Sequence, residues 1–179
     1  MDHRHLVRPA ILVGLAAAAV GVAVASAASA DDTGASHATA ALVDGAGHPV
    51  GTATFVEDAT GHVHLNVKVD GLTEGLHGIH LHSVGSCVGP SFASAGGHIN
   101  PGGVTHGNHA GDLPNLIVNA AGQGRLNTGV DSVTLSSGAV SVFDANGSAV
   151  VIHALPDDFV TDPAGNSGPR IACGVIVAD

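Results

Sequence analysis

Short stretches in which polar and apolar residues alternate recur along the chain after residue 36. The clearest covers residues 62–70, where the two kinds of side chain alternate over nine positions. A period of two is typical of a β-strand with one buried side and one solvent-facing side. Seven further short runs have a similar character: residues 38–43, 50–56, 76–82, 116–119, 125–130, 149–153 and 171–177. The pattern therefore predicts about eight strands.

Turn-forming residues separate these runs, as in Asp44-Gly45, Asp70-Gly71 and Asn146-Gly147, and the chain contains 26 glycines. We find no amphipathic helix beyond the first 30 residues, and only residues 131–137 favour a single helical turn. Short strands joined by tight turns indicate an all-β fold, an eight-stranded antiparallel sandwich or barrel of the Greek-key kind.

Two long segments interrupt the strand rhythm, at residues 83–114 and 155–170. Loops of this length without regular structure are uncommon unless they are functional or are anchored by something other than a core. Histidines are concentrated in the first of them, which makes both segments candidate functional loops.

The N-terminal 30 residues have the order of a secretory signal peptide. Arg4 and Arg8 precede an apolar run of about 16 residues, and Ala28-Ser29-Ala30 offers a cleavage site near Ala30. An uncleaved membrane anchor is the alternative, but the run is shorter than the roughly 20 residues that a spanning helix needs. We expect residues 1–30 to be removed, residues 31–36 to be a short polar linker, and residues 37–179 to be one exported domain in the envelope, the periplasm or the medium, without stable membrane insertion.

Charge and cysteine content narrow the function further. Cleavage removes Asp2, Arg4 and Arg8 and leaves three basic and fourteen acidic residues, a formal charge of −11. Such a balance argues against nucleic acid or an anionic membrane surface as a partner. Export permits a disulfide between the two cysteines, Cys87 and Cys173, although two buried free thiols remain the alternative.

The first metal-binding candidate is the pair His80 and His82. On a strand, positions i and i+2 project from the same face, so both imidazoles can reach one metal ion. The pair His62 and His64 has the same spacing. We interpret this second pair, like the remaining histidines, as solvent-facing surface.

A second candidate lies on the first long loop, where His98, His106, His109 and Asp112 fall within fifteen residues. Three imidazoles and one carboxylate make the tetrahedral set that suits structural zinc. The loop has few large apolar side chains, so a metal would do the ordering that a core cannot do. The alternative is a merely polar, histidine-rich loop that captures metal at the surface.

Two more residues complete the candidates. His153 ends an apolar run, and on its own it is weak evidence for a metal site. Together with His80, His82 and one further imidazole it makes a nitrogen-rich set of ligands that favours copper. Arg170 lies three residues before Cys173, at the end of the second long loop. Its permanently charged guanidinium suits a small anion, while an ordinary surface arginine is the alternative.

Taken together and in order, these segments resemble the copper/zinc superoxide dismutases, of the exported bacterial type. The resemblance covers about residues 37–177. The matching segments are Gly78-Ile79-His80-Leu81-His82, Cys87, Gly96-Gly97-His98-Ile99-Asn100-Pro101, His106-Gly107, His109-Ala110-Gly111-Asp112-Leu113, Val151-Ile152-His153, Asp157-Asp158, and Gly165-Asn166 through Arg170 to Cys173-Gly174-Val175-Ile176. Each segment alone is weak evidence, whereas the whole set in the same order is a strong signal.

The resemblance implies a flattened eight-stranded Greek-key barrel with one copper and one zinc ion per subunit on its outside. It implies copper ligands at His80, His82, His98 and His153, and zinc ligands at His98, His106, His109 and Asp112. It also implies that Asp157 joins His80 to His106, that Cys87 pairs with Cys173, and that Arg170 docks superoxide. His98 would bridge the two metals and carry a proton during turnover, when copper redox cycling disproportionates superoxide to dioxygen and hydrogen peroxide.

Two departures from the family pattern affect these expectations. Only two residues separate His106 from His109, fewer than in many members, and residues 154–169 contain no lysine or arginine but carry Asp157, Asp158 and Asp162. An encounter with superoxide that is slow and only weakly salt-sensitive is expected. The competing interpretation is an exported copper/zinc carrier or chaperone domain without turnover, for which an anion-docking Arg170 has no use. An inert structural β-sandwich is a third option, and the quaternary state stays open, with a homodimer as one option.

Overall fold

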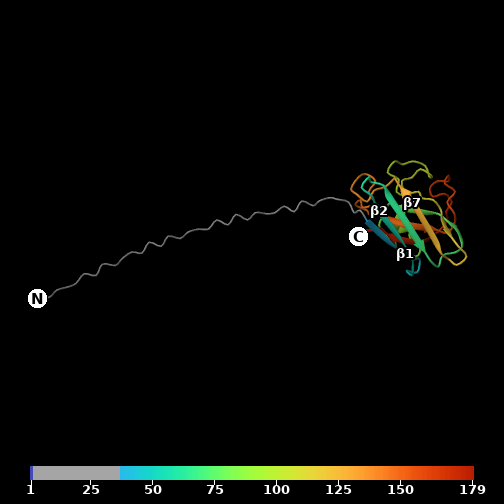
Figure 1. Cartoon of the computed structure of the whole chain (residues 1–179), viewed down its shortest axis with the longest axis horizontal. Coiled ribbons are helices and arrows are strands. Elements are labelled where there is room, and N and C mark those ends of the chain that lie inside the picture. The colour runs from blue at the N-terminus through green and yellow to red at the C-terminus, as the bar shows by residue number, and fades with distance from the viewer. Residues whose placement is uncertain (2–36) are drawn as a thin grey trace. The chain divides into compact units, whose positions relative to one another are not determined.

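A computed structural model of the chain describes Met1 and residues 37–179 (Figure 1). The signal peptide and linker predicted for residues 1–36 lie, apart from Met1, outside the described residues. Within the described part of the chain, no helix is long and apolar enough to cross a membrane.

The described residues form ten strand segments and one 3-10 helix, η1. They are β1 (His37–Asp44), β2 (Pro49–Glu57), β3 (Val63–Val69), β4 (Gly75–His77), β5 (Ile79–His82), η1 (Ala93–Ala95), β6 (Leu116–Val118), β7 (Gly124–Val130), β8 (Ala149–His153), β9 (Arg170–Val175) and β10 (Val177–Ala178). Along β3, Leu65 and Val67 are buried while His64 and Lys68 are exposed. The predicted alternation therefore sets which side of the strand faces the core.

All strand pairs are antiparallel, and their order is β4-β6-β7-β3-β2-β1-β9-β8-β5, with β10 paired to β1. β4 and β5 stand at opposite ends of this order, yet only Gly78 separates them in the chain. The sheet therefore curls into a nearly closed barrel. A side chain at Gly78 would have no room, because a Cβ atom there would lie 2.7 Å from the Cβ atom of Ser167.

The all-β barrel predicted from the sequence is confirmed, whereas the count of eight strands is too low. All eight predicted runs contain strand, but two of them are divided. The run 76–82 becomes β4 and β5, because β4 pairs with β6 and β5 pairs with β8. The run 171–177 passes through β9 into β10. Nine segments consequently lie on the continuous path of the sheet, and β10 lies off it.

The single helical turn expected at residues 131–137 does not form. Ser136 instead donates its backbone N–H to Glu57 Oε2 (2.6 Å) and its hydroxyl to Glu57 Oε1 (2.9 Å). Thr134 pairs with Ser141 in an isolated bridge. A carboxylate from β2 thus takes the backbone donor that a helical turn would use.

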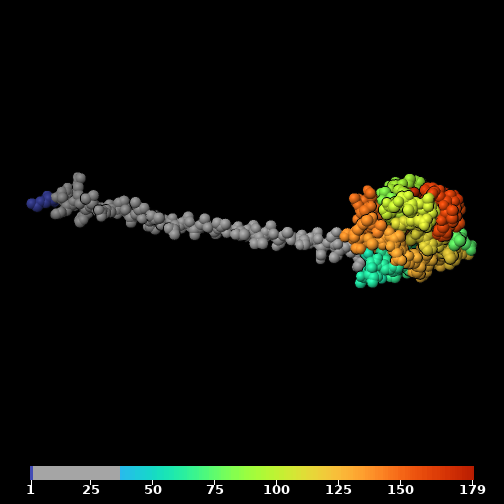
Figure 2. Space-filling model, turned by 90° about the horizontal axis from the view of Figure 1, so that it is seen from above, coloured from blue at the N-terminus to red at the C-terminus, as the bar shows by residue number. Residues whose placement is uncertain are grey.

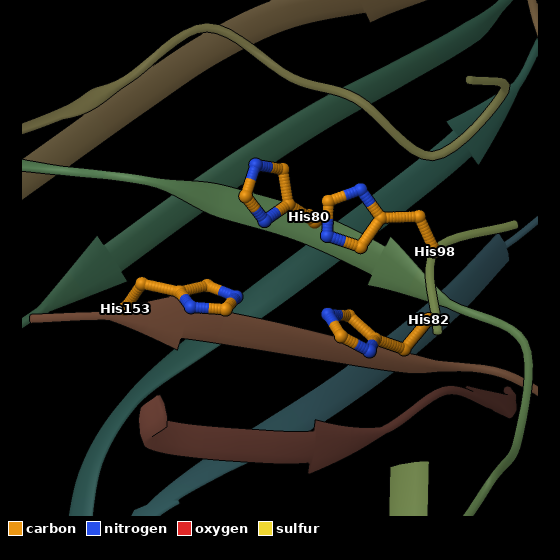
Figure 3. Close-up of side chains that lie close together, drawn as sticks. All are labelled: His80, His82, His98 and His153. Atoms are coloured by element: carbon orange, nitrogen blue, oxygen red, sulfur yellow. The ribbon is translucent and has the colours of Figure 1, made fainter. Parts of the chain in front are cut away.

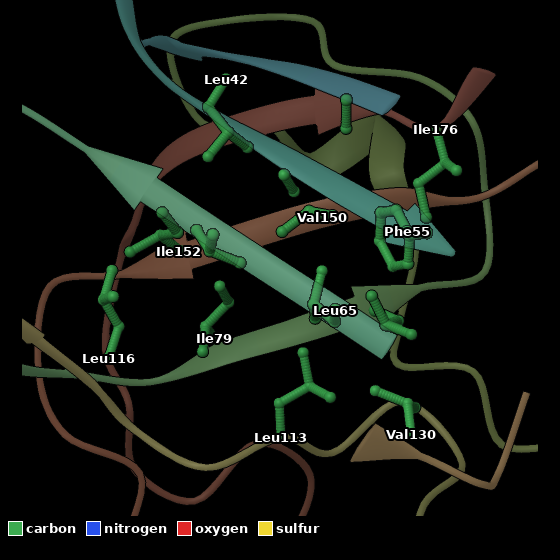
Figure 4. Close-up of a cluster of buried hydrophobic side chains, with 14 of the residues drawn as sticks. Leu42, Phe55, Leu65, Ile79, Leu113, Leu116, Val130, Val150, Ile152 and Ile176 are labelled. Atoms are coloured by element: carbon green, nitrogen blue, oxygen red, sulfur yellow. The ribbon is translucent and has the colours of Figure 1, made fainter. Parts of the chain in front are cut away.

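The core fills the barrel interior (Figure 4), where inward-facing side chains of the strands meet. The largest fully buried apolar members include Leu42, Phe55, Leu65, Ile79, Leu81, Leu116, Leu135 and Ile152. A second, smaller apolar group, here called the outer cluster, joins the first long loop to strands β8 and β9 and consists of Phe92, Ala95, Ala149, Val151 and Cys173.

The two long loops between strands contact each other on the outer side of the barrel. His106 in the first loop donates its backbone N–H to Asp162 Oδ1 in the second (2.6 Å). In Figure 2 the yellow-green atoms of the first loop border the red atoms of the second. The histidine-rich loop is therefore packed against structure on two sides rather than projecting into solvent.

Candidate metal centre

Strand β5 positions His80 and His82. Ile79 and Leu81 point into the core and are fully buried, so the alternation sends both histidines to the outer side of the barrel. The first loop covers this outer side, where Ile99 donates a backbone hydrogen bond to Leu81 (2.9 Å). His80 and His82 are therefore 0% and 1% exposed although they face outward.

His153 ends β8 and His98 belongs to the first loop, and both turn toward β5 (Figure 3). The rings of His80 and His98 stack with centroids 4.0 Å apart, and those of His80 and His153 lie 4.9 Å apart. One ligand atom from each of His80, His82, His98 and His153 lies within 4.8 Å of the others. These four residues are called the four-histidine cluster below.

Backbone carbonyl groups fix the orientation of two of these rings. His82 Nδ1 donates to the oxygen of Gly96 (3.0 Å), and His153 Nδ1 donates to the oxygen of Gly168 (3.0 Å). A carbonyl oxygen only accepts, so Nδ1 carries the proton of each neutral ring and Nε2 keeps its lone pair.

The nitrogens that face the centre of the four-histidine cluster are buried and have no hydrogen-bond partner. They are His80 Nδ1, His82 Nε2, His98 Nε2 and His153 Nε2. A buried polar atom left without a partner costs about 1–3 kcal/mol. Four converging lone pairs from imidazoles are also the donor set that suits copper. The residues present therefore fit a copper ion.

A second group, the loop cluster, consists of His98, His106, His109 and Asp112, with ligand atoms also within 4.8 Å of one another. Three Nδ1 atoms converge on Asp112 Oδ1, that of His98 at 2.8 Å, that of His109 at 3.3 Å and that of His106 at 3.4 Å. His106 Nδ1 is buried without a hydrogen-bond partner. Three nitrogens and one oxygen fit a tetrahedral zinc ion.

His98 belongs to both clusters through opposite nitrogens. Its Nδ1 faces Asp112 in the loop cluster, while its Nε2 faces the four-histidine cluster. One imidazole ring consequently separates the two candidate metal positions, as a bridging ligand would.

Asp157 connects the two clusters behind the ligand nitrogens. His80 Nε2 donates to its Oδ2 (2.7 Å) and His106 Nε2 donates to its Oδ1 (2.8 Å). The carboxylate is fully buried. Gly165, with φ of 61°, makes this possible, because a Cβ atom there would lie 1.8 Å from Asp157 Oδ1. One carboxylate thus leaves Nδ1 as the ligand nitrogen in both histidines.

Burial keeps the imidazoles of the four-histidine cluster neutral. Burial, together with the neighbouring histidines, lowers the pKa of His80 and of His82 to about 2 and that of His98 to about 4, although Asp112 opposes the shift at His98. Burial also lowers the pKa of His153. Burial alone would raise the pKa of Asp112, but hydrogen bonds from His98 and from the backbone of His109 outweigh it, so the pKa is lowered. Neutral imidazole and ionised carboxylate are the forms that bind metals.

Arg170 lies beside the four-histidine cluster, on the wall of a cavity of about 520 Å³ that His82, His98 and His153 also line. Its two terminal nitrogens donate to the backbone oxygens of Phe92 and Gly96, both at 2.6 Å. Partial burial lowers the pKa of Arg170, yet arginine stays charged in proteins. The guanidinium is therefore a fixed cation at the cavity.

A disulfide between Cys87 and Cys173 fastens the first loop to β9. Cys173 belongs to the outer cluster, together with Phe92, Ala95 and Val151, and Cys87 packs against this cluster. The same loop segment provides the carbonyl groups that hold Arg170. The pairing expected from the sequence is present, and no free cysteine remains.

The other histidines lie outside both clusters, and for one of them the predicted environment is wrong. His64 is exposed, and His62 is half-buried with an ion pair to Asp131. His77 is buried rather than solvent-facing, because both nitrogens of its ring face backbone oxygens. Its Nδ1 lies 2.7 Å from the backbone oxygen of His153, and its Nε2 lies 2.9 Å from that of Thr73.

Apart from Asp157, the residues that support the ligands were missed in the sequence. Gly96 and Gly168 act through backbone oxygens, and Asp162 accepts the backbone N–H of His106. Asn115 pairs with the backbone of Asp157 through both its side-chain oxygen (2.8 Å) and its nitrogen (2.9 Å). The only available signal was glycine itself, since Gly96 and Gly168 both have positive φ.

The fold and the two clusters define an all-β barrel with a candidate dinuclear metal centre on its outer side. The family model described as "Copper/zinc superoxide dismutase (SODC)" matches residues 49–176. The chain belongs to the copper/zinc superoxide dismutase family, which binds copper and zinc.

Individual relatives agree with this family. "Superoxide dismutase [Cu-Zn] 2" of Aquifex aeolicus is 48% identical over 104 residues, which are 54% of this chain and 61% of that protein. "Superoxide dismutase [Cu-Zn]" of Caulobacter vibrioides is 42% identical over 130 residues, 68% of this chain and 75% of that protein. A SOD-like protein from Bacillus subtilis has a similar crystal structure, with a TM-score of 0.74 and 37% identity over 78% of this chain and 97% of that one. The alignment thus spans less than two thirds of the Aquifex relative.

Proposed function

We propose that this chain is a superoxide dismutase, an oxidoreductase that converts two superoxide anions and two protons into dioxygen and hydrogen peroxide. One observation carries this proposal. Unpartnered ligand nitrogens of His82, His98 and His153 and the fixed cation of Arg170 meet at one cavity. A site for a redox metal and a site for a small anion therefore adjoin.

Copper would be held by Nδ1 of His80 and by Nε2 of His82, His98 and His153. The chemistry that copper supplies when bound is one-electron transfer, which takes an electron from one superoxide and gives it to another. Arg170 would bind the anion beside these ligands. Two carbonyl oxygens fix its guanidinium, and its remaining N–H groups are left for superoxide.

Zinc would be held by Nδ1 of His98, His106 and His109 and by Asp112. Four protein ligands close its coordination sphere, so its task would be to order the loop and to hold His98. We assign to His98 the delivery of one of the two protons, at Nε2. This is the nitrogen that faces the four-histidine cluster, and His98 also lines the cavity.

We further propose that the protein is exported, with residues 1–30 as a cleaved signal peptide, residues 31–36 as a linker and residues 37–179 as the mature domain. The Cys87–Cys173 disulfide supports this, because such bonds persist in oxidising compartments. The N-terminal sequence of the exported protein should begin near Asp31, and a start at Met1 would contradict cleavage. The homodimer stays a prediction.

The decisive experiment compares the purified copper- and zinc-loaded protein with His153→Ala in an assay of superoxide consumption. We expect the unaltered protein to be active and the variant to lose copper and nearly all activity. Activity in neither protein, with copper bound normally by the first, would favour the carrier without turnover. Equal activity in both would remove the four-histidine cluster from the reaction.

A further inference from the structure

Residues 99–112 of the first long loop, here called the zinc loop, carry most of the loop cluster but have few apolar side chains that could hold them in place. Between Ile99 and Asp112 the loop contains four glycines. The largest apolar side chain in this stretch is Val104, which is 46% exposed. Such a segment gains little from burial and loses much conformational freedom when it is ordered. Something other than a core must hold His109 in place.

Asn100 forms a two-sided hydrogen-bonded clamp on this loop. Its Nδ2 donates to the backbone oxygen of Val104 (2.9 Å), and its Oδ1 accepts the backbone N–H of Val104 (3.1 Å). Its own backbone oxygen accepts the N–H of Gly103 (3.2 Å). The side-chain amide therefore closes the turn over residues 100–104 in the way that a backbone pair closes a hairpin.

The clamp continues directly into a zinc ligand. The backbone oxygen of Val104 also accepts a hydrogen bond from His109 Nε2 (3.1 Å). That bond places the proton of His109 on Nε2 and leaves Nδ1 with its lone pair, 3.3 Å from Asp112 Oδ1. Asn100 thus fixes the carbonyl group that in turn selects the tautomer and the orientation of His109.

We propose that Asn100 is a positioning residue for zinc, which builds the metal-ready form of the loop cluster before the ion binds. The inference rests on the proposed zinc site. It explains how a gap of two residues between His106 and His109 can still present both rings, because the clamp replaces the anchoring that a longer loop would provide. Partners that orient metal ligands are typically worth about 10- to 100-fold in metal affinity.

The test uses the disulfide-intact mature protein freed of metal, and three variants. Asn100→Ala removes the clamp. Asn100→Asp has the same shape but faces the Val104 oxygen with a second acceptor. Asn119→Ala is the matched control, since Asn119 closes a comparable turn by accepting the N–H groups of Ala121 and Gln123, far from both clusters in the β6–β7 hairpin. Zinc affinity is measured by competition with a chromophoric chelator, and the His109 tautomer by nitrogen-15 NMR.

Both Asn100 variants are expected to weaken zinc binding at least about tenfold and to shift the proton of metal-free His109 from Nε2 toward Nδ1. Asn119→Ala should change neither quantity. Zinc affinity within twofold of the unaltered protein in both Asn100 variants, or an equal loss in Asn119→Ala, would overturn the proposal. If the unaltered protein binds no zinc, the zinc site of the proposed function fails. The NMR measurement then still decides the role of Asn100, because an unchanged tautomer in Asn100→Ala refutes it.

Discussion

Arg170 and His82 share one hydrogen-bond acceptor, the backbone oxygen of Gly96, which lies 2.6 Å from an Arg170 terminal nitrogen and 3.0 Å from His82 Nδ1. A single carbonyl group therefore sets both the cation and one ligand of the four-histidine cluster. Gly96 has a φ of 74°, so this carbonyl direction depends on a conformation that other residues rarely adopt.

Arg170→Ala should separate these two roles. The variant leaves the bond between His82 and Gly96 in place, so copper content should be unchanged, while the rate of superoxide consumption should fall roughly tenfold or more because the local cation is lost. Arg170→Lys should recover part of the rate, since it restores the charge without the planar fork. Copper analysis and the activity assay on the same samples are the measurements. Loss of copper in Arg170→Ala would show that the arginine is structural.

Asp157→Asn should weaken both metal sites at once. An amide oxygen can accept from His80 or from His106, but the amide nitrogen cannot accept from the other ring. We expect affinity for both ions to fall about 10- to 100-fold, as measured by metal retention during dialysis against a chelator. Asp158→Asn is the control, because Asp158 is exposed and accepts hydrogen bonds from Val160, Thr161 and Asn166 but from no metal-ligand candidate. A variant that lost one metal only would contradict a shared support.

The reaction rate should depend weakly on ionic strength. Lys68, Arg125 and Arg170 are the lysines and arginines of residues 37–179, and Arg170 alone among them lines the cavity, which also contains Asp162. Attraction by one cation is partly cancelled by that carboxylate and by the overall negative charge. We expect kcat/KM to change less than about twofold between low and physiological salt. A steep fall with added salt would contradict this balance.

Asp162→Asn removes the negative charge that opposes Arg170 at the cavity, and so tests the same electrostatic argument. The amide oxygen can still accept the backbone N–H of His106, so the loop contact survives while the charge disappears. The rate at low ionic strength should rise about two- to fivefold and should then fall more steeply with salt. Asp70→Asn makes the same change of charge away from the cavity lining and should leave the rate unaltered.

The metal-free protein should lose stability as the pH falls below about 6.5. The pKa of His80 and of His82 is about 2 in the folded protein, against an ordinary value of 6.5. Between these values the unfolded chain binds protons that the folded chain excludes, so the free energy of unfolding decreases with falling pH. Each ring contributes on the order of 1 kcal/mol per pH unit in this window. Urea unfolding from pH 7.5 to 5 measures the slope.

Two histidine variants identify which side chains cause the pH dependence of the free energy of unfolding. His82→Asn should reduce it, while His48→Asn, which changes an exposed histidine outside both clusters, is the control and should leave it unchanged. Stability that is flat between pH 7.5 and 5 would show that the rings titrate normally in the folded protein.

The sequence predicts the barrel well because alternation along each strand directly reports which side is buried. It does not predict the break at Gly78, because the split of residues 76–82 into β4 and β5 depends on the different strands with which they pair. The missing helical turn at residues 131–137 has a similar origin, since Glu57 reaches Ser136 from another strand. Pairing across the chain decides both features.

For the site, spacing identifies the side chains that converge but not what holds them. His80, His82, His98 and His153 come together as expected, and so do His106, His109 and Asp112. Their supports are largely backbone oxygens, such as those of Gly96 and Val104, which every residue possesses and which therefore leave no mark in a sequence. The burial of His77 was missed for a related reason, because its partners are also backbone oxygens.

Paired strands hold most of the candidate copper ligands, whereas a loop holds the candidate zinc ligands. The two halves of the centre therefore differ in how much sequence change they can tolerate. His80, His82 and His153 depend on the register between β5 and β8, where a slip by one position would put an apolar residue such as Ile152 in place of a ligand. Residues 101–105 are exposed, and a change in their length would leave the pairing of β5 with β8 intact at small cost. The zinc half of the centre can therefore vary in loop length as long as the Asn100–Val104 contact that positions His109 is kept, whereas the copper half allows no such change.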